Sequence, residues 1–259
     1  QKIGKDISNN VDGKTLFDEF SRGRYSTDAS VYQIKPLGVV LPKDTNDVLS
    51  LMEYSQKNSV PLLARGGGSS QCGQTVGESV VLDYSKHQNK ILELNVEEKY
   101  VWVQPGVVLD HLNAYLKPHG LWFPVDVSTS SRATIGGMSA NNSCGSRSLY
   151  YGNMVHNVLA IEAILDDGSI FNFDQINKNY LATKNNQDRL YKIIDKFIDV
   201  RQQVGGEIDA NWPTTQRRVG GYNIDLIDPE GFNSSNLLVG SEGTSVSYTH
   251  LRAHETRHY

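Results

Sequence analysis

Two glycine-rich segments of this 259-residue chain have the composition and order of residues that suit the binding of a ligand. The first reads RGGGSSQCGQ over residues 65–74 and follows the short apolar run VPLLA. A strand that ends in a glycine cluster presents backbone N–H groups with no side chains in the way, and this geometry cradles a phosphate or pyrophosphate. Three consecutive glycines also cost backbone entropy, so a simple turn of the chain explains them poorly. The segment therefore predicts an anion site lined by the backbone.

Neither of the common nucleotide-binding motifs fits this segment. The dinucleotide fingerprint G-x-G-x-x-G must lead into a helix, whereas the glycines here have other intervals and the following QTVGESVVLD predicts a strand. The P-loop pattern G-x-x-x-x-G-K-S/T matches residues 68–75 except at its lysine, because Gln74 stands there and carries no positive charge. We therefore reject the Rossmann interpretation and treat the P-loop as a near miss.

The segments around the first glycine run predict a mixture of helices and strands. Apolar β-forming residues at 31–42, interrupted by Pro36, predict an edge strand or two short pieces, and further strands are expected within 60–64, 79–85, 91–95 and 100–106. Asp44 or Thr45 can cap a helix whose apolar face includes Val48 and Leu51. Leucines at 109, 112 and 116 predict another helix, which ends at Gly120.

The second glycine-bearing segment, at residues 133–153, leads into a predicted β-hairpin. Two apolar runs in VLAIEAILDDGSIFNF are joined at Asp167 and Gly168, which is a typical hairpin turn. Apolar residues from Leu190 to Ile198 then predict an amphipathic helix that stops near Gly205. The two glycine-rich segments are expected to belong to two subdomains that face one ligand.

Composition removes several functional classes. The 25 Lys and Arg against 29 Asp and Glu give a net charge of −4, which leaves no basic surplus for nucleic acid. No run approaches the roughly 18 apolar residues of a membrane span, and the first ten residues lack the apolar run of a secretory signal. Two cysteines exclude a disulfide framework and a multi-cysteine metal site, so we expect a cytoplasmic protein, with a peripheral position at the inner membrane as the alternative.

Four motifs, taken together and in order, resemble those of one group of flavoproteins. They are YSTDASVYQ at 25–33, RGGGSSQCGQ at 65–74, STSSRATIGGMSANNSCGSRSLYYG at 128–152 and LLVGSEGT at 237–244. They are similar to the bacterial FAD-linked D-2-hydroxyacid dehydrogenases, which include the glycolate oxidase D-subunit, D-lactate dehydrogenase and D-2-hydroxyglutarate dehydrogenase. The resemblance implies an α+β fold with a two-subdomain FAD-binding domain of the p-cresol methylhydroxylase and vanillyl-alcohol oxidase type.

The resemblance also implies domain boundaries. We expect an N-terminal extension at 1–30, a first FAD-binding subdomain at 31–126 with its pyrophosphate loop at 65–74, and a second subdomain at 127–244. In the family a C-terminal domain binds the substrate, with histidines, an arginine and often a divalent metal, and it should begin soon after GSEGT. We therefore expect that domain to be absent here, and this chain alone to be incomplete and inactive. No catalytic residue is assigned.

The resemblance carries the cofactor contacts over residue by residue. Residues expected at the FAD pyrophosphate are Gly66, Gly67, Gly68, Ser69 and Ser70. Residues expected along the flavin and ribityl chain are Thr134, Gly136, Gly137, Ala140, Asn141, Asn142 and Gly145, with Gly152 and Val158 beside the cofactor and Glu242 closing the pocket. Relatives that attach flavin covalently carry a histidine in the glycine loop, and residues 65–74 contain none. The sequence therefore predicts non-covalent FAD.

The implied reaction oxidises a D-2-hydroxyacid, such as D-lactate, D-2-hydroxyglutarate or glycolate, to the 2-oxoacid. The electrons would pass to a quinone, a cytochrome or an iron–sulfur partner. Two alternatives stay open: a non-enzymatic flavin-binding or electron-transfer module, and an NADPH-dependent enolpyruvyl-sugar reductase of the same fold. The motifs YSTDAS and SRATIGGMSANNSCG favour the hydroxyacid family over the reductase.

Residues 245–259, SVSYTHLRAHETRHY, depart from the family pattern where an apolar strand is expected. They resemble translated adapter sequence, so we expect a non-native tail. Within it, HETRH at 254–258 matches H-E-x-x-H, whose two histidines would share a helix face and bind zinc. The pattern leaves no downstream third ligand, so we expect no metal site.

Several polar residues near the motifs have two interpretations each. His156 either tunes the flavin or is a satisfied structural histidine, and Arg132 either meets an anionic group or holds the scaffold. The pair Arg217 and Arg218 either guides a carboxylate substrate or is a solvated basic pair. Cys144 lies in the expected flavin-lining stretch, where a cysteine is usually a small packing residue.

Overall fold

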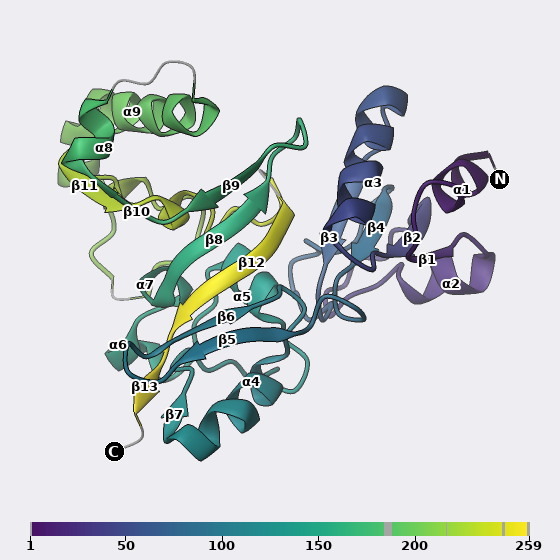
Figure 1. Ribbon diagram of the computed structural model, residues 1–259, viewed down its shortest axis with the longest axis horizontal. Coiled ribbons are helices and arrows are strands. Elements are labelled where there is room, and N and C mark those ends of the chain that lie inside the picture. Colours follow the sequence, from purple (N-terminus) through teal and green to yellow (C-terminus); the bar gives the residue numbers. More distant parts are fainter. Residues whose placement is uncertain (1, 184–187, 216, 245–246, 258–259) are drawn as a thin grey trace.

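The structure, a computed structural model, describes residues 2–183, 188–215, 217–244 and 247–257 of the chain. Two β-sheets and the helices around them form two lobes that lie side by side (Figure 1). The first sheet has the strand order β1-β2-β4-β3, and the second has the order β5-β6-β12-β8-β9. This mixture of helices and sheets confirms the α+β class that the sequence predicts.

The first lobe is built from residues 2–83. Its strands are β1 (Lys14–Leu16), β2 (Gly38–Leu41), β3 (Leu62–Arg65) and β4 (Val80–Asp83), and its helices are α1 (Lys2–Ser8), α2 (Glu19–Arg24) and α3 (Thr45–Asn58). Strands β2 and β3 run parallel to β4, while β1 pairs antiparallel with β2. Every residue of β2 and β4 is buried, as expected for parallel strands that are covered on both faces.

Helix α3 begins where the sequence predicts. The Asp44 carboxylate accepts hydrogen bonds from the backbone N–H groups of Asn46 and Asp47, at 2.9 and 3.3 Å. Val48 and Leu51 lie on its buried face, against β2 and β4. The cap and the apolar spacing thus agree with the observed helix.

The second lobe contains the five-stranded antiparallel sheet. Its strands are β5 (Ile91–Asn95), β6 (Tyr100–Val103), β8 (Val158–Ile164), β9 (Ile170–Phe173) and β12 (Ser247–His254). Around it lie α4 (Leu109–Leu116), the 3-10 turn η1 (Lys117–His119), β7 (Leu121–Trp122) paired with β13 (Thr256–Arg257), α5 (Ile135–Asn141), α6 (Ser148–Tyr151) and α7 (Met154–Asn157). The main hydrophobic core lies in this lobe and includes Val103, Leu112, Phe123, Ile161 and Leu251.

A smaller cluster extends the second lobe beyond β9 (upper left in Figure 1). It consists of β10 (Gln175–Asn177), β11 (Gly231–Asn233), α8 (Lys178–Ala182), α9 (Arg189–Asn211), η2 (Ile224–Leu226) and η3 (Ser234–Leu237). Ile176, Ile194 and Phe232 form part of its core. The predicted helix from Leu190 is confirmed, but it continues to Asn211, beyond Gly205. A glycine weakens a helix by only about 1 kcal/mol, and the buried Ile208 packs the extra turns.

The sheets divide the chain differently from the expected boundaries. The first sheet ends with β4 at Asp83, and β5 and β6 already pair in the second sheet, well before the expected boundary at residue 126. The segment expected as an extension at 1–30 contributes β1 to the first sheet and the buried Ile7 to its core. Of the two alternatives predicted for residues 31–42, the edge strand is wrong, because β2 begins at Gly38 and lies between β1 and β4. Each of these differences arises because a strand pairs with a partner that the local sequence pattern does not identify.

Strand β12 occupies the middle of the second sheet, between β6 and β8. His254 therefore ends a strand, so the helical arrangement that the H-E-x-x-H pattern requires is not formed there, and His258 lies outside the described residues. In the described ranges no three His, Cys, Asp or Glu residues cluster as a metal site. The non-native origin of residues 245–259 stays a prediction.

None of the described helices combines the length and the apolarity that crossing a membrane would require.

Glu255 provides a test of how residues 247–257 pack. Its side chain is fully buried, neither carboxylate oxygen has a hydrogen-bond partner among the described residues, and burial raises the pKa of this carboxyl well above 4.5. The folded chain therefore binds this proton more tightly than the unfolded chain, so stability falls as the pH rises from the ordinary pKa to the folded one. We expect Glu255→Gln to stabilise the fold at pH 8 by about 1–3 kcal/mol, and by less as the pH approaches 4.5.

Thermal unfolding between pH 4.5 and pH 8 measures this effect. The exposed Glu97 serves as the matched control, because Glu97→Gln removes a charge from the nearby turn without changing a buried group. Coinciding melting curves of Glu255→Gln and the parent chain at pH 8 would contradict the buried position of this carboxyl.

Candidate functional site

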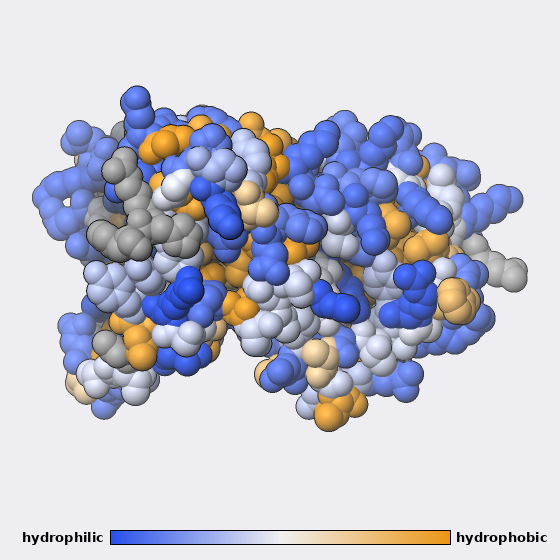
Figure 2. Space-filling model, turned by 90° about the horizontal axis from the view of Figure 1, so that it is seen from below, coloured by the Kyte–Doolittle hydropathy of each residue, from blue (hydrophilic) through white to orange (hydrophobic). Residues whose placement is uncertain are grey.

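A cavity of about 450 Å³ lies between the two sheets. Its wall comes from the end of β3 and the loop that follows, from residues 127–144 around α5, and from the loop at 241–243. Seen from below, the surface has a recess between the lobes in which hydrophobic residues are exposed (Figure 2). The volume falls in the range of pockets that bind small molecules and cofactors.

The first glycine-rich segment follows β3 directly and lines this cavity. None of the backbone N–H groups of residues 67–71 donates a hydrogen bond to a described group. Gly68 has a φ of 63°, a left-handed conformation that favours glycine. A run of unused donors beside a cavity is the arrangement that binds an anion.

Gly66 and Gly67 are required for a second reason, which the sequence does not reveal. A Cβ atom on Gly66 would overlap the hydroxyl of Thr134, and one on Gly67 would overlap the backbone carbonyl of Arg132. The glycine loop therefore lies in direct backbone contact with the second lobe. Any side chain here would push the two walls of the cavity apart.

Arg65 holds the glycine loop from behind. Its guanidinium donates to the backbone carbonyls of Thr27, Thr75 and Tyr25, at 2.8, 3.1 and 3.3 Å. The hydroxyl of Tyr25 donates in turn to Asp83 at 2.6 Å, and burial raises the pKa of Tyr25. Because the donors of Arg65 are engaged in this scaffold, an anion in the cavity would depend on the backbone N–H groups.

Helix α5 forms the opposite wall. Thr134 caps it by accepting a hydrogen bond from the N–H of Gly137 at 3.3 Å. A Cβ atom on Gly136 would lie 2.6 Å from the Cβ of Pro105, so this glycine lets α5 pack closely against the preceding loop. Two of the α5 residues that line the cavity, Gly137 and Ala140, are small and leave room for a ligand beside the backbone.

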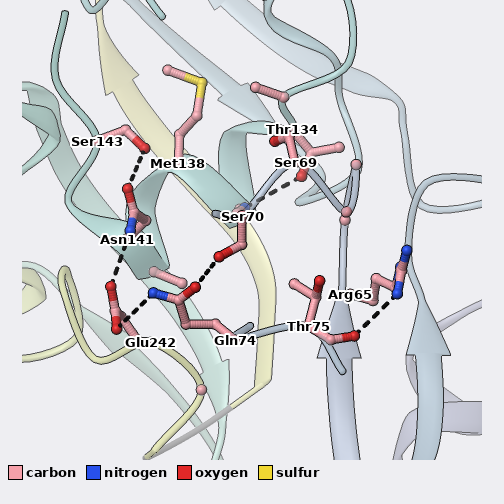
Figure 3. A pocket seen from close by; sticks show the side chains of 18 of the residues that line it. Arg65, Ser69, Ser70, Gln74, Thr75, Thr134, Met138, Asn141, Ser143 and Glu242 are labelled. Carbon is pink, nitrogen blue, oxygen red and sulfur yellow. Dashed lines mark hydrogen bonds between the residues drawn. The ribbon is translucent and has the colours of Figure 1, made fainter. Parts of the chain in front are cut away.

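A chain of side-chain hydrogen bonds links the two walls (Figure 3). Ser70 donates to Gln74, whose amide donates to Glu242 at 3.2 Å. The other carboxylate oxygen of Glu242 accepts from the amide of Asn141 at 3.0 Å, and Asn141 accepts from Ser143 at 3.0 Å. Glu242 has a φ of 48°, a left-handed conformation that is uncommon for a residue with a side chain. It is the only acidic residue among the described residues that line the cavity.

The structure brings eleven of the fifteen predicted cofactor residues to the cavity. They are Gly66, Gly67, Gly68, Ser69, Ser70, Thr134, Gly136, Gly137, Ala140, Asn141 and Glu242. Their contact with a cofactor stays a prediction. The lining residues that sequence reasoning missed include Gln74 and Ser143, which stand inside the quoted motifs, although no sequence signal showed which way their side chains point.

The other four residues expected beside the cofactor do not line the cavity, and their contact with a cofactor stays a prediction. Asn142 is fully buried, with a φ of 50°, and its side chain accepts from the N–H of Val155 and donates to Asn223. Gly145 packs against Asp126, and Gly152 packs against the ring of His156 at a φ of 78°. Val158 is buried at the start of β8. These residues shape the backbone behind the wall.

His156 has the structural role among its two interpretations. Its Nδ1 atom accepts a hydrogen bond from the N–H of Asn153 at 3.0 Å and completes the cap of α7. Burial lowers the pKa of His156, which favours the neutral ring that this bond requires.

The three arginines have different surroundings. Arg132 is exposed, and Arg218 pairs with Asp225 and lies over the ring of Trp212. Arg217 contacts Cys144.

Comparisons with known proteins agree with this site. The model of the family described as "FAD binding domain" matches residues 36–174. The chain is 36% identical over 255 residues to a D-2-hydroxyglutarate dehydrogenase of Escherichia coli, an alignment that covers 95% of this chain and 25% of that protein. It is 36% identical over 176 residues to the glycolate oxidase subunit GlcD of Bacillus subtilis, covering 65% of this chain and 37% of that protein.

The chain thus spans about a quarter of the length of the D-2-hydroxyglutarate dehydrogenases that it matches. A solved alkyldihydroxyacetonephosphate synthase has the same fold, with a TM-score of 0.65 at 19% identity, over 94% of this chain and 38% of that one. These matches confirm the resemblance to FAD-linked D-2-hydroxyacid dehydrogenases on which the sequence prediction rests.

Two neighbouring asparagines test the separation between the cavity wall and the scaffold behind it. We expect Asn142→Ala to lower the free energy of unfolding by about 2–4 kcal/mol, because it removes buried hydrogen bonds and places alanine at a positive φ. Asn141→Ala removes only the exposed bonds to Glu242 and Ser143, so a loss below about 1 kcal/mol is expected. Urea unfolding of both variants measures the difference. Equal losses would contradict the placement of these two side chains.

Proposed function

The chain belongs to the FAD binding domain family, and from that premise we propose that its cavity holds FAD non-covalently as part of a D-2-hydroxyacid-oxidising enzyme. The observation that carries this proposal is the run of unused backbone N–H groups at residues 67–71, which follow β3 and line the cavity. Such a run suits the pyrophosphate of FAD, because it offers several donors without a side chain between them and the ligand.

The rest of the cavity suits the remainder of the cofactor. Gly137 and Ala140 of α5 offer a wall of small residues, against which a flat ring can lie close to the backbone. The hydroxyls and amides of Ser70, Gln74 and Asn141 offer partners for a polyhydroxyl chain. No histidine occurs among the described residues that line the cavity, which supports non-covalent binding.

Bound FAD would supply the acceptor for the hydride equivalents that leave the α-carbon of the hydroxyacid. The residues of this chain bind and orient: residues 67–71 hold the anion, Arg65 fixes the loop, and the chain from Ser70 to Ser143 holds the two walls together. We assign the substrate class to 2-hydroxycarboxylates, because the relatives are named for D-2-hydroxyglutarate and glycolate. The substrate-binding domain and the electron acceptor, a quinone, cytochrome or iron–sulfur partner, belong to the whole protein.

The purified chain should show a flavin absorption spectrum, either as isolated or after incubation with FAD. Acid precipitation should release all of this flavin into the supernatant, because no covalent bond retains it. Flavin that stays with the precipitate would contradict non-covalent binding. A folded chain that takes up no FAD would contradict the proposal as a whole.

Gly67→Ala should reduce FAD retention at least about tenfold, because its Cβ atom meets the Arg132 carbonyl and displaces the donor loop. Gly77→Ala is the matched control, since a Cβ atom at Gly77 would lie 3.6 Å from its nearest neighbours, at ordinary contact distance. Equilibrium dialysis with FAD measures retention, and circular dichroism shows that each variant is folded. Equal retention in the two variants would refute the role of the glycine loop.

A further inference from the structure

Arg217 lies at the rim of the cavity, where its guanidinium contacts the lining residue Cys144. Cys144 lines the cavity, and its Sγ atom lies 3.2 Å from Nε and 2.9 Å from Nη2 of Arg217. Val219, two residues further along, lines the same cavity. The guanidinium therefore presents two of its N–H groups, on the side that would bind a planar anion, to an atom of the cavity wall.

The charge of Arg217 is not matched by the described residues around it. No described carboxylate lies within 4.0 Å of its guanidinium, whereas the neighbouring Arg218 pairs with Asp225. Its partner is a cysteine sulfur, which is a weak hydrogen-bond acceptor. The guanidinium fork can therefore exchange this partner for a stronger one at little expense.

Neither of the two charged residues among the described residues that line the cavity is available to pair with the carboxylate of a substrate. Arg65 is the one basic residue among the described lining residues, and it donates to three backbone carbonyls. Glu242, the acidic one, would repel a carboxylate. A 2-hydroxyacid is an anion at neutral pH, so a cation that is free to pair with its carboxylate would strengthen its binding beside the cofactor.

We propose that Arg217 binds the carboxylate of a small 2-hydroxyacid at the cavity rim, and that the Cys144 sulfur holds the guanidinium when no substrate is present. The fork of an arginine matches a carboxylate with two parallel hydrogen bonds, which also orients the substrate. This inference takes its class of ligand from the proposed function. It adds a substrate-positioning residue that belongs to the FAD-binding chain itself.

The cysteine makes this site testable without turnover. The Cys144 thiolate displaces iodide from iodoacetate or iodoacetamide, so that one C–S bond forms, one C–I bond breaks and iodide leaves. Iodoacetate carries a carboxylate beside its reactive carbon, as glycolate carries one beside its hydroxyl carbon, whereas iodoacetamide is neutral. Cys72 is the internal control, because it also lines the cavity but contacts no arginine among the described residues.

The readout is the ratio of the iodoacetate rate to the iodoacetamide rate at each cysteine, measured by peptide mass spectrometry of the FAD-loaded chain. A general effect of Arg217 on thiolate reactivity cancels in this ratio. We expect the ratio at Cys144 to exceed that at Cys72 by about tenfold or more, and Arg217→Gln to abolish the excess. Glycolate should protect Cys144, whereas ethylene glycol, which lacks the carboxylate, should not.

Equal ratios at the two cysteines, or an excess that persists in Arg217→Gln, would overturn the proposal. Arg132→Gln is the matched control for the loss of one exposed arginine charge, and the excess should survive in it. FAD binding is scored separately on the same samples. An excess in a chain that binds no FAD would refute the proposed function alone, whereas FAD binding without the excess would refute the carboxylate site alone.

Discussion

The close approach of two backbones is the constraint on which the cavity depends. Gly66 and Gly67 touch Thr134 and the carbonyl of Arg132 directly, with no room for a Cβ atom on either glycine. This contact fixes the end of β3 against the start of α5, and thereby one lobe against the other. The glycine loop cannot move closer to the second lobe, because its glycines already touch it. The hydrogen bonds of Arg65 hold the loop on its other side, so its position beside the cavity is fixed.

Hydrogen bonds elsewhere in the site help to hold the two lobes in this arrangement. The chain of hydrogen bonds through Gln74, Glu242 and Asn141 spans the cavity at another point, so the two walls are joined at two places. Behind α5, the buried Asn142 connects the helix end to Val155 and Asn223. The cavity wall is thus a thin layer of small residues supported by a buried polar scaffold.

Local patterns predicted the elements, and non-local contacts decided the rest. The Asp44 cap and the turn at Asp167 and Gly168 depend on neighbours in the sequence, so both could be recognised there. The insertion of β12 between β6 and β8, and the pairing of β1 with β2, depend on segments far apart in the chain. The motifs found the site, but they could not separate Asn141, which faces the cavity, from Asn142, which is buried behind it. That distinction follows from the left-handed turn that ends α5.

The anion site proposed at residues 67–71 is made of neutral dipoles, and this has a kinetic consequence. The chain carries a net charge of −4, and the one basic residue among the described lining residues is occupied by backbone carbonyls. The net charge of the chain therefore supplies no overall attraction for a dinucleotide. The association rate constant of the ligand would be an ordinary diffusive one with little dependence on ionic strength. Tight binding would then result from a slow dissociation rate.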